Sequence, residues 1–356
     1  MTLDIIRLEN LGKLRILNFG GAEGTIHLAS DGKLVKIYNN NSPKEAAEND
    51  KRLRIIANNG GLYKNFAYFC AIPEAIIESA GVAIGFKMSH FQGFHPLGRL
   101  ASKEFCVSNK ITIRKVAMIF LKLHDFLSDI HQRGFVIGDF NPDNIMFKLV
   151  NKSVHFAFVD VDSWAISKGS TVLPLLSITP GLCHPELEKD RSRAKQYHDW
   201  YSFALLLARS LVKGDPFNLG VLDNSTMAAI RGERRIHGIT CWDQRILLPR
   251  ELAPYMQRFG KKLTDELVKW LKGKENGVFL KEVLEDFLDK LSMCYGSLGN
   301  KQCILEAHLS LVRCPRCGEK LSQPLPRAKH HKNTAQQYPL TQDQSLLDSL
   351  FKKMVK

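Results

Sequence analysis

Hydrophobic and polar positions change their spacing along the chain, from short alternating runs in the first third to helical intervals further on. The first third contains three apolar runs that are separated by glycine-containing turns, RILNF, TIHLAS and KLVKIY. Runs of this length between turn residues are typical of strands. Two further apolar runs, within residues 72–91, flank the turn Ser79-Ala-Gly81 and predict a hairpin. The start of the chain therefore predicts a small sheet.

Helical spacing predominates further along the chain. A first helix is predicted from Pro43 to Ala57, behind the cap residue Ser42. Between Thr112 and Arg133, apolar residues recur at helical intervals and predict a second, longer helix. A strand pair, NIMFKL and HFAFVDV, follows and turns at Asn151-Lys-Ser153, and three helical segments come after it: HDWYSFALLLARSLV, KKLTDELVKWL and KEVLEDFLDKLSMC. The patterns together predict an α+β protein.

The end of the chain has a different character. Residues 322–342 are polar and contain prolines, which predicts a flexible linker. Within residues 343–356, five apolar positions recur at helical spacing: Leu346, Leu347, Leu350, Phe351 and Met354. We expect a terminal amphipathic helix there, which docks either on its own protein or on a partner.

Composition places the chain among ordinary globular proteins. Of its 356 residues, 44% are hydrophobic and 24% are charged, which suits about two packed domains and excludes a disordered chain. The sequence has no long uncharged apolar run, and Asp4 and Glu9 lie where a signal peptide would be apolar. Most of the eight cysteines are scattered, which is typical of a reducing compartment. We therefore expect a cytoplasmic protein with no membrane segment.

The formal net charge of +14 would attract partners rich in phosphate or carboxylate, that is, a nucleotide, a nucleic acid or an acidic protein. Part of the surplus is concentrated between Arg231 and Lys274, where 11 lysines and arginines stand against five acids. This stretch is either a solvated surface or a basic face on which a protein docks. Its few aromatic residues have the spacing of core residues, so we do not expect a platform for nucleic acid.

A glycine-rich turn lies between the first two predicted strands. Its glycines, Gly20, Gly21 and Gly24, would let backbone amides approach phosphate oxygens closely. The next strand places Lys36 among apolar residues. A buried lysine needs an anionic partner, and a nucleotide phosphate together with a helix glutamate supplies one. The alternative is a lysine on an edge strand that reaches solvent.

Two acidic motifs follow the long predicted helix. In the stretch GDFNPDN, Asp139 can accept a proton from an attacking hydroxyl, and Asn144 can turn back towards a metal ion. Asp160 comes after the apolar strand FAFV, and we expect it to bind Mg2+. Asp162 stands two residues on in a run that we expect to be extended, so it would face the same side as a further ligand or orienting group. A simpler interpretation is a pair of turns rich in Asp and Asn.

In order and approximate spacing, these blocks resemble the signature blocks of the protein-kinase fold over about residues 12–290. The matching positions are Gly21, Gly24, Ile26, Lys36, the Asp139 loop, Asp160, His184-Pro-Glu186 and Asp199 with the apolar residues after it. The motifs GGAEG, IGDFNPDN, VDVDSW and a late CPxC are similar to those of atypical bacterial kinase-like proteins. In that group an IDxDS motif replaces DFG, and a zinc knuckle follows the catalytic domain.

The resemblance implies a two-lobed protein-kinase-like fold with a β-rich N-lobe at 1–92, a helical C-lobe at 93–295 and a zinc-knuckle module at 296–321. It implies ATP and Mg2+ as cofactors, a hinge from Met88 to Gln92, and transfer of phosphate to serine or threonine of a protein. Lys36 would contact the phosphates and pair with a helix glutamate, either Glu45 or Glu48. We take Glu48, because it leaves more chain between strand and helix. Glu186 would anchor its lobe.

Asp199, by the same resemblance, would tie down the backbone of the catalytic loop; a plain helix cap is the alternative.

Two departures from the kinase pattern bear on activity. Gly138 stands where most kinases have the arginine that binds a phosphorylated loop, and Asn141 stands where they have a lysine that stabilises the transferring phosphate. Slow or absent turnover is the expectation. A nucleotide-binding pseudokinase that recruits a partner is therefore a second hypothesis, and a kinase of small molecules is a third.

Four late residues have the spacing of a zinc site. Cys303, His308, Cys314 and Cys317 form C-x4-H-x5-C-x2-C, which offers the four soft or borderline ligands of a closed tetrahedral site. Cys294 or His330 can replace Cys303 or His308 in this set. Unmetallated cysteines and a redox dithiol are the alternatives, but a structural Zn2+ is our prediction.

Overall fold

The computed structural model describes residues 3–21, 23–59, 70–150, 153–168, 171–220, 227–248, 250, 252–273, 279–321 and 324. They belong to one compact unit that runs from Met1 to Pro324. The predicted linker, apart from Pro324, and the predicted terminal helix lie outside the described residues. In the part of the chain that is described, no helix is long and apolar enough to cross a membrane. The described elements make a mixed α+β protein, as predicted.

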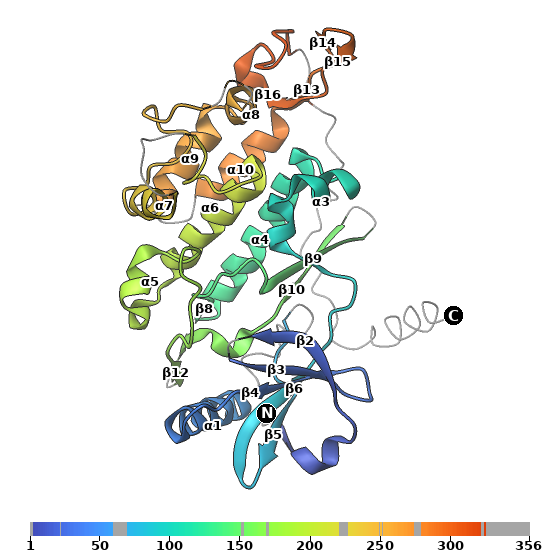
Figure 1. Cartoon of the computed structure of the whole chain (residues 1–356), viewed down its shortest axis with the longest axis vertical. Helices are drawn as coiled ribbons and strands as arrows, with labels where there is room; N and C mark the ends of the chain where they lie inside the picture. Colours follow the sequence, from blue (N-terminus) through green and yellow to red (C-terminus); the bar gives the residue numbers. More distant parts are fainter. Residues whose placement is uncertain are drawn as a thin grey trace, which may run out of the picture. The chain divides into compact units, whose positions relative to one another are not determined.

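The first part of the chain forms a six-stranded sheet with the strand order β1-β5-β6-β4-β3-β2 (Figure 1). The strands are β1 (Asp4–Arg7), β2 (Arg15–Gly21), β3 (Gly24–Leu28), β4 (Leu34–Tyr38), β5 (Ala75–Ser79) and β6 (Val82–Met88). The three predicted strands and the hairpin are confirmed. The β1 strand was not predicted; it pairs in parallel with β5, while the other neighbours are antiparallel.

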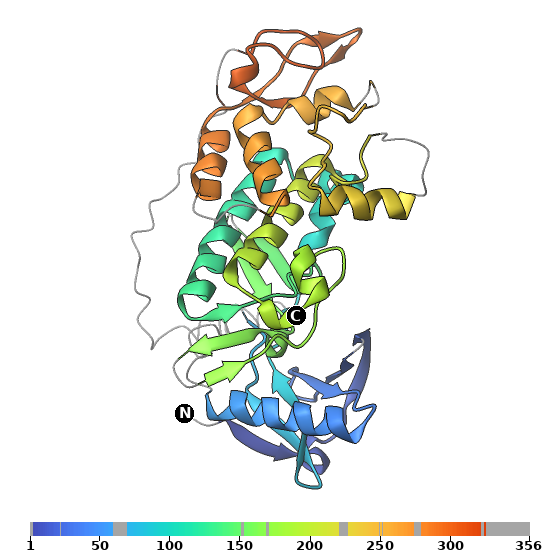
Figure 2. The same ribbon diagram turned by 90° about the vertical axis from the view of Figure 1, so that its left-hand side faces the viewer.

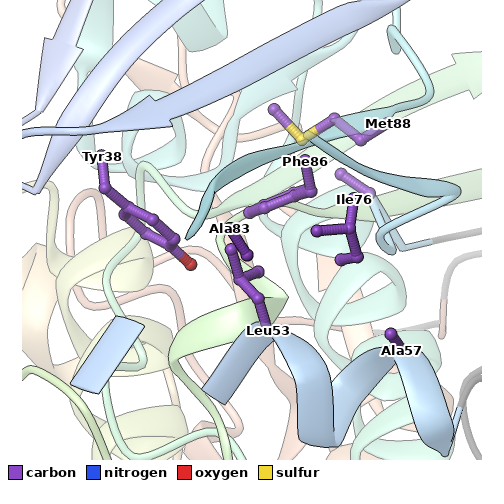
Figure 3. Close-up of a cluster of buried hydrophobic side chains, with 8 residues drawn as sticks. Tyr38, Leu53, Ala57, Ile76, Ala83, Phe86 and Met88 are labelled. Atoms are coloured by element: carbon purple, nitrogen blue, oxygen red, sulfur yellow. The ribbon is translucent and has the colours of Figure 1, made fainter. Parts of the chain in front are cut away.

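Helix α1 (Pro43–Asn58) covers the sheet (Figure 2). Its start is fixed as predicted, because Ser42 Oγ accepts the N–H of Glu45, and the Glu45 carboxylate accepts the N–H of Asn41. The buried Leu53 and Ala57 face the sheet residues Ile76, Ala83 and Phe86 in the same apolar cluster (Figure 3). The helix is therefore held by its apolar face, and its orientation decides which charged residues point at the sheet.

The later part of the chain is mainly helical. The helices are α3 (Lys103–Ser108), α4 (Ile113–Gln132), α5 (Pro185–Lys189), α6 (Gln196–Val212), α7 (Met227–Ile236), α8 (Ala253–Gln257), α9 (Lys261–Leu271) and α10 (Phe279–Asp289). The apolar stripe predicted for α4 is buried along its whole length. Phe120 packs edge-on against Phe203 of α6, and their ring centroids are 5.4 Å apart. Helix α6 is almost wholly buried and contacts both α4 and α9, so it forms the centre of this part.

Short strands connect the helices. One small sheet has the order β10-β9-β7, from β7 (His95–Pro96), β9 (Ile145–Val150) and β10 (Ser153–Phe158); another has the order β12-β11-β8, from β8 (Phe135–Val136), β11 (Ala165–Lys168) and β12 (Thr171–Leu173). Two strand pairs lie near the end: β13 (Leu291–Met293) with β16 (Glu306–His308), and β14 (Ser297–Leu298) with β15 (Lys301–Gln302). The 3-10 helices are η1 (Leu8–Leu11), η3 (Leu97–Ala101), η4 (Val161–Ser163), η5 (Arg191–Arg193) and η6 (Leu309–Leu311).

The last predicted helix ends earlier than its pattern indicated. We expected KEVLEDFLDKLSMC to be helical throughout, but α10 ends at Asp289. The following residues form β13, in which Leu291 pairs with His308 of β16. Backbone pairing with a later strand overrides the local helical pattern here. As a result Cys294 lies just after a strand, beside the other late cysteines.

Candidate functional site

Lys36 lies at the centre of an acidic cluster. It is 4% exposed and sits on β4, an interior strand, which contradicts the edge-strand alternative. Its Nζ donates to Asp160 Oδ1, to Asp162 Oδ2 at 3.0 Å and to Glu23 Oε2 at 3.5 Å. The structure thus brings Lys36 together with two acids of the later motif. We call Lys36, Glu23, Asp160 and Asp162 the Lys36 cluster.

Charges in this cluster influence each other strongly. Burial alone would disfavour the ammonium, but Asp162, Asp160 and Glu23 outweigh it and hold the pKa of Lys36 well above its usual value. Burial raises the pKa of Asp160 to about 6; Lys36 opposes this change, while Asp162 and Glu23 add to it. Burial is thus the main cause of the raised pKa of Asp160, and the Lys36 ammonium and the two neighbouring carboxylates act on it in opposite directions.

The two aspartates reach the cluster by a different backbone path from the one predicted. Asp160 has φ of 61°, in the left-handed region, and residues 161–163 form η4, so the run is not extended. Asp is among the few residues other than glycine that adopt this conformation readily. The sharp turn still directs Asp162 inwards, where it is 0% exposed and accepts a 2.5 Å hydrogen bond from the Tyr38 hydroxyl.

Neither helix glutamate pairs with Lys36, and the prediction of Glu48 is wrong. The Glu48 side chain is 63% exposed and lies 3.9 Å from Lys44 Nζ, while Glu45 caps its own helix. The apolar face of α1 packs on the sheet, and this orientation turns Glu48 outwards. Glu23, from the turn between β2 and β3, is the third acid at Lys36 instead. No spacing rule in the sequence pointed to it.

Arg52 is a further residue that the sequence analysis missed. It is 6% exposed and donates from α1 to three backbone carbonyls, Asp162 O at 2.5 Å, Trp164 O at 2.6 Å and Pro174 O at 2.7 Å. Its guanidinium thereby fixes the segment that follows Asp160 to helix α1. A signal was available, because Arg52 is four residues before the buried Ile56 and so lies on the apolar face of the helix.

Replacing Arg52 with lysine should destabilise the protein by about 1–3 kcal/mol, because one ammonium cannot satisfy three separated carbonyls. The matched control is Arg54→Lys on the same helix. Arg54 is 40% exposed, pairs with Asp50 and Glu78 and donates to the Gly81 carbonyl in contact with solvent. Because water can replace these exposed bonds, its replacement should change stability by less than about 0.5 kcal/mol. Urea unfolding followed by circular dichroism measures both variants. Equal stability of the two would contradict the role given to Arg52.

The Asp139 loop is braced by hydrogen bonds to a later segment. Asp139 is 8% exposed; its Oδ1 accepts the N–H of Thr179 at 2.8 Å, and its Oδ2 accepts Asn144 Nδ2 at 3.5 Å. Burial raises the pKa of Asp139, hydrogen bonds from Thr179 oppose this, and Glu23 adds to it. Glu23 thus connects this loop electrostatically with the Lys36 cluster. Asn141 donates to Thr179 Oγ1 at 3.1 Å, so its amide braces the loop.

Asp199 holds the backbone just before Asp139. The Asp199 carboxylate is 0% exposed and accepts the N–H of Ile137 at 2.8 Å, the N–H of Gly138 at 2.7 Å and His131 Nε2 at 2.8 Å. The helix-cap alternative is therefore wrong, and the tie to the loop backbone is confirmed. Gly138 has φ of +67°, and a Cβ there would lie 2.4 Å from Leu175 Cδ1. The left-handed backbone at this position favours glycine, and a larger side chain would also displace Leu175.

The other predicted nucleotide-binding residues lie on the sheet. Gly24 starts β3, where a Cβ would lie 2.5 Å from Ile37 O, so the neighbouring strand already requires glycine. Gly20 and Gly21 end β2, and Gly21 pairs with Gly24. Half-buried Ile26 pairs with Lys36. Buried Met88 ends β6, and the chain continues to β7, which pairs with β9.

His184, Glu186 and His198 form another group with ligand atoms close together. The Nδ1 atoms of both histidines accept backbone N–H groups, from Glu186 and from Lys195 respectively. Each Nε2 therefore carries the proton, which leaves no lone pair for a metal. The Glu186 side chain is half exposed, and its carboxylate accepts hydrogen bonds from the Tyr197 hydroxyl and from His198 Nε2, both on α6. Glu186 thus ties α5 to α6, in agreement with its predicted anchoring role, and Glu188 adds an ion pair with the buried Arg235 at 2.8 Å.

Four cysteines form the second candidate site, the cysteine cluster of Cys294, Cys303, Cys314 and Cys317. Their Sγ atoms all lie within 4.8 Å of one another; Cys294 and Cys317 are 3.4 Å apart, and Cys303 and Cys314 are 3.8 Å apart. These separations exclude disulfides, whose S–S distance is about 2.05 Å. Four thiolates bound to Zn2+ at about 2.3 Å lie about 3.8 Å apart, so the arrangement fits a closed tetrahedral site.

His308 does not belong to this cluster, and Cys294 takes the place predicted for it. His308 ends β16, where its Nδ1 lies 2.7 Å from Ser310 Oγ and its Nε2 lies 3.9 Å from Asp286 Oδ2. The pairing of β16 with β13 directs its ring towards α10, against Phe287. The alternative ligand His330 lies outside the described residues.

Part of the predicted basic face is structural. Arg234 and Arg235 are buried, and Arg258 is half-buried. Arg234 donates to the carbonyls of Pro216, Leu219, Gly220 and Ile239, whereas Arg258 lies over the rings of Tyr255 and Phe259. These contacts hold the three guanidinium groups within the helical part of the protein, so these arginines contribute little to a basic face. The residues that could still form a basic docking face are exposed lysines such as Lys261, Lys262 and Lys269.

No family model matches the chain, and no curated protein matches it either.

Proposed function

We propose that the chain is an atypical protein kinase that transfers the γ-phosphate of ATP to a serine or threonine hydroxyl of another protein. In this proposal the six-stranded sheet with α1 is the N-lobe, and the helical part is the C-lobe. The observation that carries it is the convergence of Lys36, from a strand of the sheet, with Asp160 and Asp162, which follow β10. A lysine and paired acids from separate segments suit a metal-bound phosphate group.

Each group has a part in the proposed reaction. Asp160, Asp162 and Asn144 would hold Mg2+, and the Lys36 ammonium would contact the phosphates. The orphaned Oδ1 of the buried Asp162, which has no hydrogen-bond partner among the described residues, supports a cation here. Mg2+ would neutralise charge on the phosphates when bound. Asp139 would accept the proton of the attacking hydroxyl, and the two hydrogen bonds from the Ile137 and Gly138 N–H groups to Asp199 would keep its loop in place.

One observation favours a second candidate function, nucleotide binding without efficient transfer. Asn141 stands where a kinase has a lysine, and its amide is occupied on both sides, by Thr179 Oγ1 and by the N–H of Asp143. It supplies no positive charge to the transferring phosphate. A pseudokinase of this kind would act by recruiting a partner, and the remaining lysines near α9 or the terminal segment are candidates for that contact.

Phosphate transfer can be tested with γ-labelled ATP and Mg2+, using the protein itself and generic acceptor proteins as substrates. Asp139→Asn and Asp160→Asn should each lower label incorporation by about 100-fold or more. Asparagine also adopts the left-handed backbone of Asp160, so this variant should fold. The control is Asp31→Asn on an exposed loop, which should retain activity. Unchanged incorporation in both site variants would refute the assignment, and ATP binding without transfer would favour the pseudokinase.

We further propose that the cysteine cluster holds a structural Zn2+ and that the protein works in the reducing cytoplasm, where these thiols persist. The spacing of the four Sγ atoms supports this ion. With four protein ligands the site is closed, so the ion would stabilise the fold and take no part in phosphate transfer.

A further inference from the structure

Glu23 adds a carboxylate to the Lys36 cluster that the predicted Mg2+ ligands do not include. It lies in the turn between β2 and β3, and its side chain is 27% exposed. Single carboxylate oxygens of Glu23, Asp160 and Asp162 all lie within 4.8 Å of one another. Three acids from two separate segments of the chain therefore meet at one point, with Lys36 beside them.

The charges at this point do not balance. In the part of the chain that the structure describes, Lys36 is the one cation that forms ion pairs with these three acids. Arg52 lies close by, but it donates to backbone carbonyls, not to the carboxylates. Three negative charges and one positive charge leave an excess of two negative charges in a largely buried place. One divalent cation would neutralise that excess.

Asp162 gives an independent indication of a missing ligand. Its side chain is 0% exposed, and its Oδ2 accepts hydrogen bonds from Lys36 and Tyr38. Its Oδ1, on the same carboxyl group that faces the cluster, has no hydrogen-bond partner among the described residues. A buried carboxylate oxygen with neither a hydrogen-bond donor nor a cation beside it lowers the stability of the folded state. Tyr38 and Lys36 already take the other oxygen, so the open one is available to a cation.

We propose that Glu23 is a third carboxylate ligand of a divalent cation, Mg2+ or Mn2+, which the Lys36 cluster binds before any nucleotide arrives. This inference rests on the metal site of the proposed function, but it does not depend on phosphate transfer. Hard divalent cations take carboxylate oxygens and retain several waters, so three acids from one turn and one loop suffice. Glu23 sits on the glycine-containing turn, so binding of the cation fixes this turn to the segment around Asp160.

The test is a titration of the full chain with Mn2+ alone, without nucleotide, in which the free ion is followed by electron paramagnetic resonance. Hard Mn2+ prefers oxygen ligands and does not compete for the cysteine cluster. The wild type should bind one Mn2+ per chain. Glu23→Gln should weaken this binding by roughly tenfold or more, and Asp162→Asn should do likewise. The matched control, Glu9→Gln, removes an exposed acid of η1 and should bind as the wild type does.

The outcomes separate this inference from the proposed function. If Glu23→Gln binds Mn2+ as tightly as the wild type while Asp162→Asn loses Mn2+ binding, the role of Glu23 is overturned. The predicted metal site at Asp160 and Asp162 is then still supported. A wild type that binds no Mn2+ without nucleotide overturns the inference as well, whereas the ATP assay can still show transfer. Because the Glu23 side chain is partly exposed, its variant should keep the thermal midpoint of the wild type, which confirms that the protein is folded.

Discussion

Cys294→Ser should abolish the proposed zinc binding and unfold the structure around β13 and β16. Cys294 directly follows β13, and its Sγ accepts the N–H of Gly296 at 3.4 Å. The local core is small, with Cys303, Leu305, Ala307, Cys314 and Leu321 as its other buried members. A core of this size is not stable without a cross-link such as a disulfide or a metal ion. A structural zinc contributes about 10 kcal/mol of binding free energy.

The effect should spread beyond the cysteine cluster. The Glu306 carboxylate in β16 accepts the N–H of Ile113, the first residue of α4, at 2.7 Å. The N–H of His308 donates to Arg258 O at 2.9 Å. Both bonds join β16 to the helical part of the protein. Loss of zinc should therefore lower the thermal midpoint of the whole compact unit, and a strong chelator added to the wild type should have the same effect.

His308→Gln distinguishes the zinc ligands predicted from the sequence, which include His308, from those in the structure, which include Cys294. The sequence pattern predicted His308 as a ligand, whereas the structure places Cys294 there, so elemental analysis should find about one zinc per chain in His308→Gln and much less in Cys294→Ser. Cys183→Ser changes a buried cysteine away from the cluster and should keep its zinc. If His308→Gln lost the metal while Cys294→Ser kept it, the ligand assignment would be wrong.

Local signals in the sequence were sufficient for much of the fold. The stripe of α4, the Ser42 cap of α1 and the turn at Gly81 depend on residues close together in the chain, and the structure contains all three. The end of α10 was predicted wrongly because residues with a helical pattern pair instead with β16, a strand 13–17 residues further along the chain. The strand β1 was missed for the same reason, since its partner β5 is about 70 residues away.

The same distinction between local signals and contacts between separate segments applies to the candidate site. Lys36, Asp160 and Asp162 were predicted, because a lysine in an apolar strand and acids after one are unusual in the sequence itself. Glu23 and Arg52 were not predicted. Glu23 lies in the glycine-rich turn between β2 and β3, and no spacing rule connects it with Lys36. The spacing of Arg52 from the buried Ile56 places it on the apolar face of α1, but only the packing of α1 on the sheet, which turns Glu48 out to solvent, shows that its guanidinium meets the Asp162 backbone.

Asp199→Asn should destabilise the protein by about 3–5 kcal/mol, which is a large part of the stability of an ordinary domain. The carboxylate accepts three hydrogen bonds and is 0% exposed. Asparagine has nearly the same shape, but its amide nitrogen would face a donor, either a backbone N–H or His131 Nε2. At least one buried N–H then has no acceptor, and two donors oppose each other.

The control is Asp129→Asn on α4, whose carboxylate is 39% exposed and pairs with Arg133 one helical turn away. It should change the free energy of unfolding by less than about 0.5 kcal/mol, because exposed pairs of this kind contribute little. Urea unfolding gives both values, and hydrogen exchange gives the local effect: the amides of Ile137 and Gly138 should lose protection in Asp199→Asn. Full protection of these two amides would contradict the bonds to Asp199. Because Gly138 directly precedes Asp139, a loosened loop should also lower any phosphate transfer, which links the stability of α6 with the position of the proposed base.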